Sequence, residues 1–485
     1  MSDKKKLMLF SHVCNSRNIT GAEKLLLFLA RTFSSYFDCT IVMPGEGRLT
    51  QLANEAGIRT IIHEFPLMYG IFTPYEGLIQ DIQAYIQSPG CRVAITLLQD
   101  ERPDYVFVNT CVNAMPAIAA KSLAIPVIWH ITEVIIDTAY IQHAINTIDQ
   151  YSDLIICISN SAMTPFLPYR IEDKLALLYP SWNQDDLNSS EWQSWRWQKR
   201  MKWGISANEK LIGYISSFLT PEKGADHFIR AATLIGAAHP ETRFVIIGGE
   251  LDKEFFRKLR HLVTYSGIKN RFLFVDHEQN IEAAYCAMDI VIIPGLIREG
   301  FGLTAMEAMI FGKPVVAYAS GGLEEILTSV GSGCFLAPPG NEAELVHKAR
   351  QLLETPDLAE QVGRNNQYGA VAVFGRGAHD ERVQEIIGRI QGLSRNPIPL
   401  PFSSVPTSTV PQSAVAPVES AVSPSVGRTQ GKVGYKHRSV SGRRRKRKAG
   451  AKSRSRRKTA KRSSQRSTRR KSSRRRRGIR KSGQN

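Results

Sequence analysis

The chain has 485 residues, 43% of them hydrophobic, which is enough for two sizeable cores. No apolar run reaches the roughly 18 residues of a membrane span, and the basic N-terminus precedes an apolar run too short for a secretory signal. The seven cysteines form no CxxC pair, which favours buried free thiols in a reducing cytoplasm over disulfides or a zinc site.

The net charge of +19 belongs to one end of the chain. Residues 428–485 hold 27 of the 63 Lys and Arg residues and none of the 44 acids, so residues 1–427 have 36 basic and 44 acidic side chains, a net charge of −8. A segment so rich in Arg, Lys and Ser cannot form a core, and we expect a disordered tail. The seven prolines in residues 396–427 predict an extended linker ahead of it.

Short apolar runs alternate with helical stretches through the first part of the chain. Strands are predicted at 7–13, 39–43, 60–63, 105–109, 127–130 and 154–158, with helices between them, such as 22–33 and 115–123. This alternation is typical of βαβ units in a doubly wound parallel sheet. We therefore predict an N-terminal Rossmann-like domain over residues 1–185.

A tryptophan-rich segment, residues 186–208, is predicted to join two domains. Five of the six tryptophans fall between 182 and 203, and residues 191–203 are basic and amphipathic at helical spacing. One interpretation is a helix at a membrane interface. The other, which we favour, is a helix packed against the following domain, with tryptophan as a large core residue.

The βαβ pattern then begins again. Strands are predicted at 211–215, 244–247, 272–275, 290–293, 314–317 and 334–336. These runs predict a second Rossmann-like domain over residues 209–395. The predicted architecture is thus α/β, with two doubly wound domains followed by the linker and the tail.

The segment 298–327 carries the most specific chemistry. A buried strand is followed by the turn Gly300-Phe301-Gly302 and then by a helix, an arrangement that presents free backbone N–H groups to a phosphate. Glu299 is expected at the lip of the sheet, where ligands bind. Glu307 is expected roughly 7–8 Å further along the helix, so one acid can face a sugar and the other a ribose hydroxyl.

This segment resembles the donor site of retaining glycosyltransferases of the GT-B fold, specifically glycosyltransferase family 4. The resemblance covers roughly residues 5–390 and implies two domains that face a cleft. It also implies that Glu299 and Glu307, the amides around Phe301, Gly302 and Leu303, and the Gly-Gly-x-x-Glu sequence ending at Glu325 bind a nucleotide-sugar.

Three further positions resemble landmarks of that family. Gly21 opens the first helix and would lie against a diphosphate, although Thr20 replaces one expected glycine. His130 is mapped onto the histidine that contacts the transferred sugar; a histidine on an apolar strand is otherwise a core residue. Lys223 would neutralise the leaving diphosphate.

The chain departs from the family at a second expected cation. Ser217 and Phe218 stand where a glycine and an arginine are usual, so one phosphate contact is missing. No Asp-x-Asp metal motif follows a strand, and we expect neither a metal nor another cofactor. The predicted catalytic residues are Glu299, Lys223 and His130. The predicted donor-binding residues are Gly21, Gly300, Phe301, Gly302, Leu303, Glu307 and Glu325.

We therefore expect a bacterial, cytoplasmic hexosyltransferase. It would move a sugar from a nucleotide diphosphate to a glycan, lipid or protein with retention of configuration. Two alternatives remain open: an inactive GT-B scaffold, which Phe218 favours, and a polyanion-binding protein that acts through its tail. The tail resembles Arg/Lys/Ser-rich segments of spore-coat and surface-assembly proteins. It would bind membrane, wall polymer or nucleic acid and place the protein peripherally at a membrane or spore surface.

Overall fold

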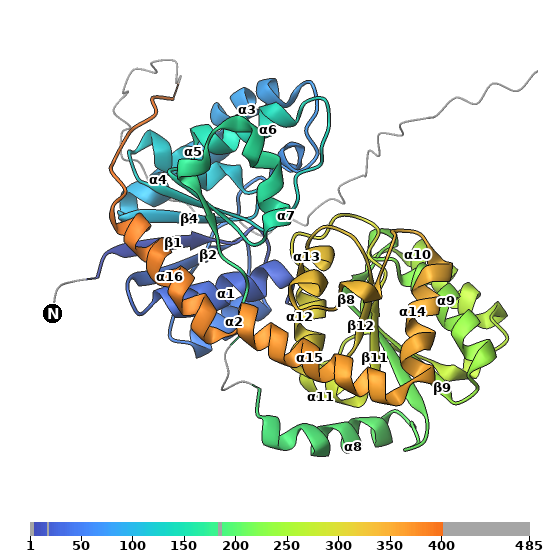
Figure 1. Cartoon of the computed structure of the whole chain (residues 1–485). Coiled ribbons are helices and arrows are strands. Elements are labelled where there is room, and N and C mark those ends of the chain that lie inside the picture. The colour runs from blue at the N-terminus through green and yellow to red at the C-terminus, as the bar shows by residue number, and fades with distance from the viewer. Residues whose placement is uncertain (1–3, 17–18, 183–186, 401–485) are drawn as a thin grey trace, which may run out of the picture. The chain divides into compact units, whose positions relative to one another are not determined.

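The computed structural model describes residues 4–16, 19–182 and 187–400. The predicted tail and most of the predicted linker lie outside these residues. In the described part, two parallel sheets each carry helices on their faces (Figure 1). We call β1–β7 with their helices the first lobe and β8–β13 with theirs the second lobe. The predicted α/β class, with two Rossmann-like halves, is confirmed.

The first sheet has seven parallel strands in the order β3-β2-β1-β4-β5-β6-β7. The strands are β1 (Lys6–Phe10), β2 (Asp38–Met43), β3 (Arg59–Ile62), β4 (Tyr105–Asn109), β5 (Val127–Ile131), β6 (Leu154–Cys157) and β7 (Leu175–Leu177). Its helices are α1 (Gly21–Phe33), α2 (Arg48–Glu55), α3 (Leu78–Ile86), α4 (Pro89–Glu101), α5 (Ala114–Ser122), α6 (Ile141–Gln150) and α7 (Asn160–Met163).

The second sheet has six parallel strands in the order β10-β9-β8-β11-β12-β13. The strands are β8 (Lys210–Leu219), β9 (Thr242–Glu250), β10 (Phe272–Val275), β11 (Ile290–Ile293), β12 (Val315–Tyr318) and β13 (Leu336–Ala337). The helices of this part of the chain are α8 (Trp192–Lys202), α9 (Ala225–Ala238), α10 (Lys253–Tyr265), α11 (Ile281–Ala287), α12 (Leu303–Ile310), α13 (Gly322–Ser329), α14 (Glu342–Glu354), α15 (Pro356–Phe374) and α16 (Arg376–Gln391).

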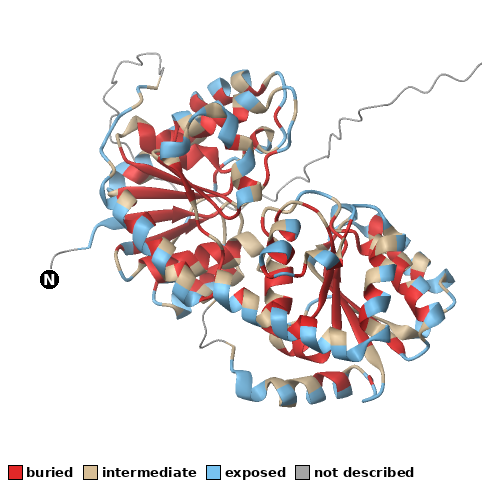
Figure 2. Ribbon diagram, in the orientation of Figure 1, coloured by how far each residue is buried: buried red, intermediate tan, exposed pale blue. Residues whose placement is uncertain are grey.

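Most predicted strands lie within a residue or two of their observed positions. The main differences are β7, a three-residue strand that was not predicted, and β8, which runs four residues beyond its predicted end. In addition, β1 ends three residues before its predicted end, and β9 runs three residues beyond its own. β8 continues because an irregularity between Ile215 and Phe218 lets Phe218 pair with Gly249. The central strands are almost entirely buried (Figure 2), as expected for parallel sheets covered on both faces.

The last helix does not stay with the second lobe. In α16, the apolar side chains of Val383, Ile386 and Ile390 belong to the buried cluster that contains β1 and β2. Arg389 donates to the backbone carbonyls of Asp173 and Leu175 beside β7. The segment 209–395, predicted as one domain, therefore ends with a helix that completes the core of the first lobe.

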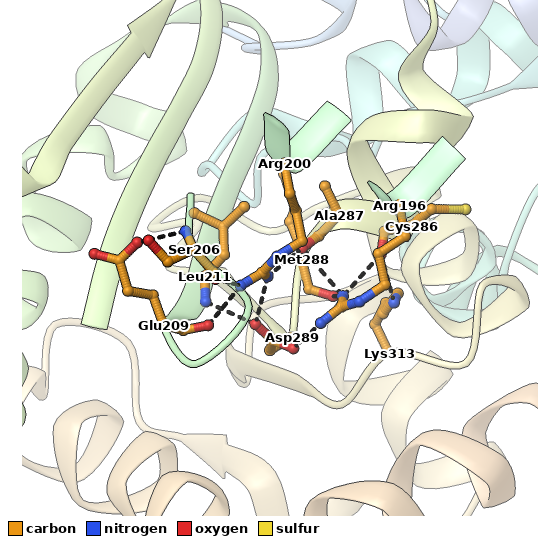
Figure 3. A network of polar contacts seen from close by, with 10 residues as sticks. All are labelled: Arg196, Arg200, Ser206, Glu209, Leu211, Cys286, Ala287, Met288, Asp289 and Lys313. Atoms are coloured by element: carbon orange, nitrogen blue, oxygen red, sulfur yellow. Dashed lines mark hydrogen bonds and ion pairs between the residues drawn. The ribbon is translucent and has the colours of Figure 1, made fainter. Parts of the chain in front are cut away.

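The tryptophan-rich helix α8 is attached to the second lobe by two arginines. Arg196 binds Asp289 at 2.6 Å and donates to the carbonyls of residues 286–288, which end α11 (Figure 3). Arg200 binds the other oxygen of Asp289 at 3.1 Å. Trp192 and Trp195 pack against the main buried cluster. These contacts favour the packed interpretation of this segment.

We expect Asp289→Asn to lower the free energy of unfolding by about 3 kcal/mol, because two guanidinium groups lose their carboxylate. Burial alone would raise the pKa of Asp289, but Arg196, the Leu211 amide and Arg200 outweigh it and hold that pKa below its usual value. A lowered pKa stabilises the folded state above the ordinary carboxyl pKa, and this stabilisation is lost as the pH falls through the lowered value.

Urea unfolding followed by tryptophan fluorescence tests this prediction. The difference between wild type and Asp289→Asn should be full at neutral pH and should shrink in acid. Asp380→Asn, which breaks the exposed Arg376–Asp380 pair, is the matched control and should change stability by less than about 1 kcal/mol. Equal losses of stability in both variants would contradict the role assigned to Asp289.

The described residues also bear on membrane insertion and on the state of the thiols. None of the helices they form is both long and apolar enough to cross a bilayer. All seven cysteines are free, and five are buried as predicted, but Cys14 is partly exposed and Cys334 is exposed.

Candidate functional site

Two adjoining cavities lie at the carboxyl ends of the two sheets. Their volumes are about 650 and 400 Å³, and they share six lining residues: Gly21, Ile215, Ser216, Ser217, Leu303 and Thr304. Glu307 lines the larger cavity, whereas Glu299 and Lys223 line the smaller one. Eight of the ten predicted site residues border this shared space; His130 and Glu325 do not.

The helix α12 begins at the junction of the cavities. Gly302 is its N-cap residue, with a positive φ of 106° that favours glycine. Leu303 and Thr304 form the first turn, where backbone N–H groups have no partner within the helix. The positive end of the helix dipole therefore faces the shared space and can hold an anion there.

Glu299 and Lys223 form an ion pair in the smaller cavity. The Lys223 Nζ lies 2.6 Å from Glu299 Oε1. The backbone of Glu299 is fixed, since its amide binds the Ser320 carbonyl and its own carbonyl accepts from Gly322 at 2.7 Å. The lysine loop is equally fixed: a Cβ on Gly224 would lie 1.9 Å from the carbonyl oxygen of Pro294. The pair is therefore preorganised at the end of the sheet.

Glu307 has two side-chain partners. Its Oε2 accepts a 2.8 Å hydrogen bond from the buried Tyr285 hydroxyl. Its Oε1 lies 3.0 Å from the Nζ of Lys24, which comes from α1 in the first lobe. This contact joins the two lobes directly at the larger cavity.

The loop before α1 is held by a buried carboxylate. Thr20, the residue that replaces the expected glycine, is the N-cap of α1, and its hydroxyl accepts from the Glu23 amide. Glu23 in turn accepts from the amides of Asn15 and Thr20 and from both side chains. These bonds fix Gly21 at the cavity, where its Cα faces Leu303 of α12.

The lobes also meet at Gly300. A Cβ there would lie 2.0 Å from the carbonyl oxygen of Thr132, directly after β5. The Ser159 hydroxyl donates to the Gly300 carbonyl from the first lobe. Glycine is thus required for this close approach of the two backbones.

His130 is placed in the core instead of the cavity. It is 1% exposed, packs on Phe107 and makes a 2.9 Å hydrogen bond to Asn109 Oδ1. Burial lowers its pKa to about 3, so the imidazole is neutral. Asn109 also donates to the Ala22 carbonyl in the first turn of α1. The structure therefore gives His130 a supporting position at the α1 end of the site, and its contact with the sugar stays a prediction.

Glu325 binds the first lobe and does not face the cavities. Its carboxylate accepts from the amides of Asn160 and Ser161 at the start of α7, from both their side chains and from the Tyr179 hydroxyl. Burial alone would raise its pKa, but these hydrogen bonds hold it below the usual value. The structure thus places Glu325 in a link between the lobes, and its role in donor binding stays a prediction.

Thr132, Glu133 and Lys24 are among the cavity residues that were absent from the predicted site. Thr132 and Glu133 follow β5 and line the smaller cavity. The Glu133 carboxylate accepts from the Cys111 amide and the Thr132 hydroxyl, yet burial raises its pKa above the usual value. The third residue is Lys24. No group of three or more His, Cys, Asp or Glu side chains suited to a metal ion occurs among the described residues.

Solved structures with the same architecture include HepE of Anabaena in complex with UDP and glucose. It is 21% identical, with a TM-score of 0.66, over 79% of this chain and 99% of that one. WaaG, a glycosyltransferase involved in lipopolysaccharide biosynthesis, has a TM-score of 0.59 at 15% identity over 80% of this chain and 100% of that one. The chain has the GT-B fold. The cavities described above thus lie between the two lobes of a GT-B protein.

Sequence comparisons point to the second lobe in particular. The family described as "Glycosyl transferases group 1" matches residues 196–368. The 2-deoxystreptamine glucosyltransferase of Streptomyces kanamyceticus is 32% identical over 182 residues, 36% of this chain and 46% of that protein. The lipopolysaccharide core mannosyltransferase LpsB of Rhizobium meliloti is 30% identical over 160 residues, 32% of this chain and 45% of that protein. The matches span less than half the length of these relatives.

Proposed function

We propose that this GT-B protein is a retaining glycosyltransferase of family 4 that transfers a hexose from a nucleotide diphosphate to an acceptor. The observation that carries the proposal is the Lys223–Glu299 pair in a cavity continuous with the N-terminus of α12. The family match supports it, since residues 196–368 include Lys223, Glu299 and Glu307. The relatives named above are glycosyltransferases.

In this proposal, positive charge is concentrated where the leaving group develops negative charge. The amides of Gly302 and Leu303 and the Lys223 ammonium stabilise the departing diphosphate. Glu299 orients Lys223 and accepts from sugar hydroxyls, while Glu307 binds the ribose. These residues would serve without a metal ion or other cofactor.

The proposed chemistry is a front-face substitution at the anomeric carbon. The bond between this carbon and the phosphate oxygen breaks, and a bond to the acceptor oxygen forms on the same face. The acceptor proton passes to the leaving phosphate oxygen, so configuration is retained and no side chain need act as base.

A donor screen tests the function. The intact protein is incubated with UDP-, GDP-, ADP- and dTDP-sugars, and nucleotide release is measured with and without glycan, lipid and protein acceptors. Release from one donor class supports an enzyme. No release from any donor, with the protein folded, supports the scaffold alternative that Phe218 favours.

Replacing Glu307 by Gln tests the ribose assignment. We expect the donor KM to rise more than kcat falls, because a ribose contact is made equally in the ground state and the transition state. Steady-state kinetics with the donor found in the screen measures both constants. A fall in kcat with unchanged KM would contradict this role.

The basic tail is proposed as a separate anchor for anionic membranes, wall polymers or nucleic acid. Ile398 and Leu400 pack against the main cluster, so a truncation should retain residues 1–400 and remove 401–485. We expect kcat on a small soluble acceptor to be unchanged and salt-sensitive retention on anionic vesicles or heparin to be lost. A folded truncated protein without turnover would show that the tail belongs to the active site.

A further inference from the structure

The helices α1 and α12 meet with their N-termini at the same point. A Cβ on Gly21 would lie 2.9 Å from Leu303 Cδ1. One turn further along each helix, Lys24 Nζ and Glu307 Oε1 are 3.0 Å apart. Gly21 and Leu303, the first residues of the two helices, line both cavities. Both positive helix ends therefore face the shared cavity space, where the diphosphate is proposed to bind.

Cations are scarce around this space. Among the described residues, three Lys or Arg side chains line the two cavities: Lys24, Arg48 and Lys223. Lys223 is already paired with Glu299. Phe218 stands at the lip of the smaller cavity, where the resemblance would place an arginine. A nucleoside diphosphate carries two or more negative charges. Lys223 is the cation that the second lobe contributes to these cavities within the described residues, so the second lobe alone neutralises the diphosphate only in part.

Lys24 is placed to supply the missing charge. Its attraction to Glu307 outweighs burial and raises its pKa, so the ammonium is charged. Glu307 does not depend on Lys24 for its orientation, since the Tyr285 hydroxyl holds the other carboxylate oxygen. A ribose hydroxyl that binds Glu307 Oε1 would release the ammonium. The four-carbon stem of lysine then lets it reach one helical turn, about 5 Å, toward Gly21 and Leu303.

We propose that Lys24 is a donor-binding residue that moves from Glu307 to the diphosphate when the nucleotide binds. This inference rests on the proposed function and goes beyond it, because it assigns a phosphate contact to the first lobe. The Lys24–Glu307 ion pair would be replaced by two contacts with the nucleotide, between the Glu307 carboxylate and the ribose and between the Lys24 ammonium and the diphosphate. Donor binding would then depend on residues of both lobes.

A different role for Lys24 makes the opposite prediction. If the Lys24–Glu307 pair only holds the cleft in its unliganded form, the nucleotide must break it without compensation. Removing the ammonium would then strengthen binding of nucleosides and nucleoside diphosphates alike. The ratio of the two affinities separates these roles.

The experiment is isothermal titration of the full chain with UDP, GDP, ADP and dTDP and with the matching nucleosides, at 0.15 M salt. The variants are Lys24→Gln, Lys24→Arg, Arg48→Gln and, as the matched control, Arg31→Gln. Arg31 lies on α1 two turns after Lys24 and lines neither of the two cavities. The basic tail is the same in every variant, so its binding of nucleotide cancels in the comparison.

We expect Lys24→Gln to weaken diphosphate binding about tenfold or more, on the scale of one charge-assisted hydrogen bond, without weakening nucleoside binding. Lys24→Arg should keep most of the affinity, and Arg31→Gln should keep all of it. The inference is overturned if Lys24→Gln binds the diphosphate as well as wild type, if it binds both ligands more tightly, or if the loss appears only in Arg48→Gln. Wild type that binds none of the four diphosphates overturns the proposed function as well.

Discussion

Glu299→Gln and Lys223→Ala should each lower turnover by roughly 10²-fold or more, the scale of losing one preorganised electrostatic group. The two side chains lie 2.6 Å apart, so neither keeps its orientation when the other is removed. The double variant should therefore be little worse than the poorer single variant, because residues that act as a unit give non-additive losses. Steady-state rates of nucleotide release measure all three proteins.

Glu324→Gln is the matched control for this experiment. Glu324 is an exposed acid in the first turn of α13, close in sequence to the loop that holds Glu299, and lines neither cavity. Its loss should leave turnover unchanged. Folded Glu299→Gln with nearly wild-type turnover would remove the main support for this site.

Gly300→Ala should lower kcat/KM by roughly 10²-fold, comparable to the effect of a 1 Å misplacement of catalytic groups. The new methyl group would lie 2.0 Å from the Thr132 carbonyl oxygen, and backbone atoms on both sides prevent a small adjustment. The lobes must then separate, or the loop carrying Glu299 must shift. Either change disturbs Glu299 relative to the first lobe.

Kinetics and thermal unfolding together test the Gly300 prediction. The melting temperature should change little, because the contact lies between the lobes and not within either core. Gly388→Ala is the control, since a Cβ at this position in α16 meets no atom within 4 Å. A Gly300→Ala enzyme with full activity would show that the lobe approach seen at Gly300 is not needed for turnover.

The positions of most strands along the chain were predictable because these strands are apolar runs bounded by turns. The donor segment was also predictable, since strand, glycine turn and helix are contiguous in sequence. The placement of His130 was harder to predict because of where the strand ends. The predicted strand stopped at His130, but β5 continues to Ile131, which pairs with Cys157, so His130 lies inside the ladder opposite Asn109. The residues that follow β5, Thr132 and Glu133, therefore line the smaller cavity.

Contacts between distant segments could not be predicted from local patterns. Glu325 meets Asn160 across 165 positions, and Lys24 meets Glu307 across 283. The helical pattern of α16 shows an apolar face but does not identify the lobe that covers it. Each of these contacts depends on where the two lobes lie relative to each other. The sequence pattern of a single strand or helix does not specify this.

A structure of the full chain with a bound nucleoside diphosphate tests the proposed donor site. We expect the diphosphate at the amides of Gly302 and Leu303, beside Gly21 and within reach of Lys223, with the ribose hydroxyls against Glu307. A nucleotide bound elsewhere, or two cavities that stay empty at saturating nucleotide, would contradict it.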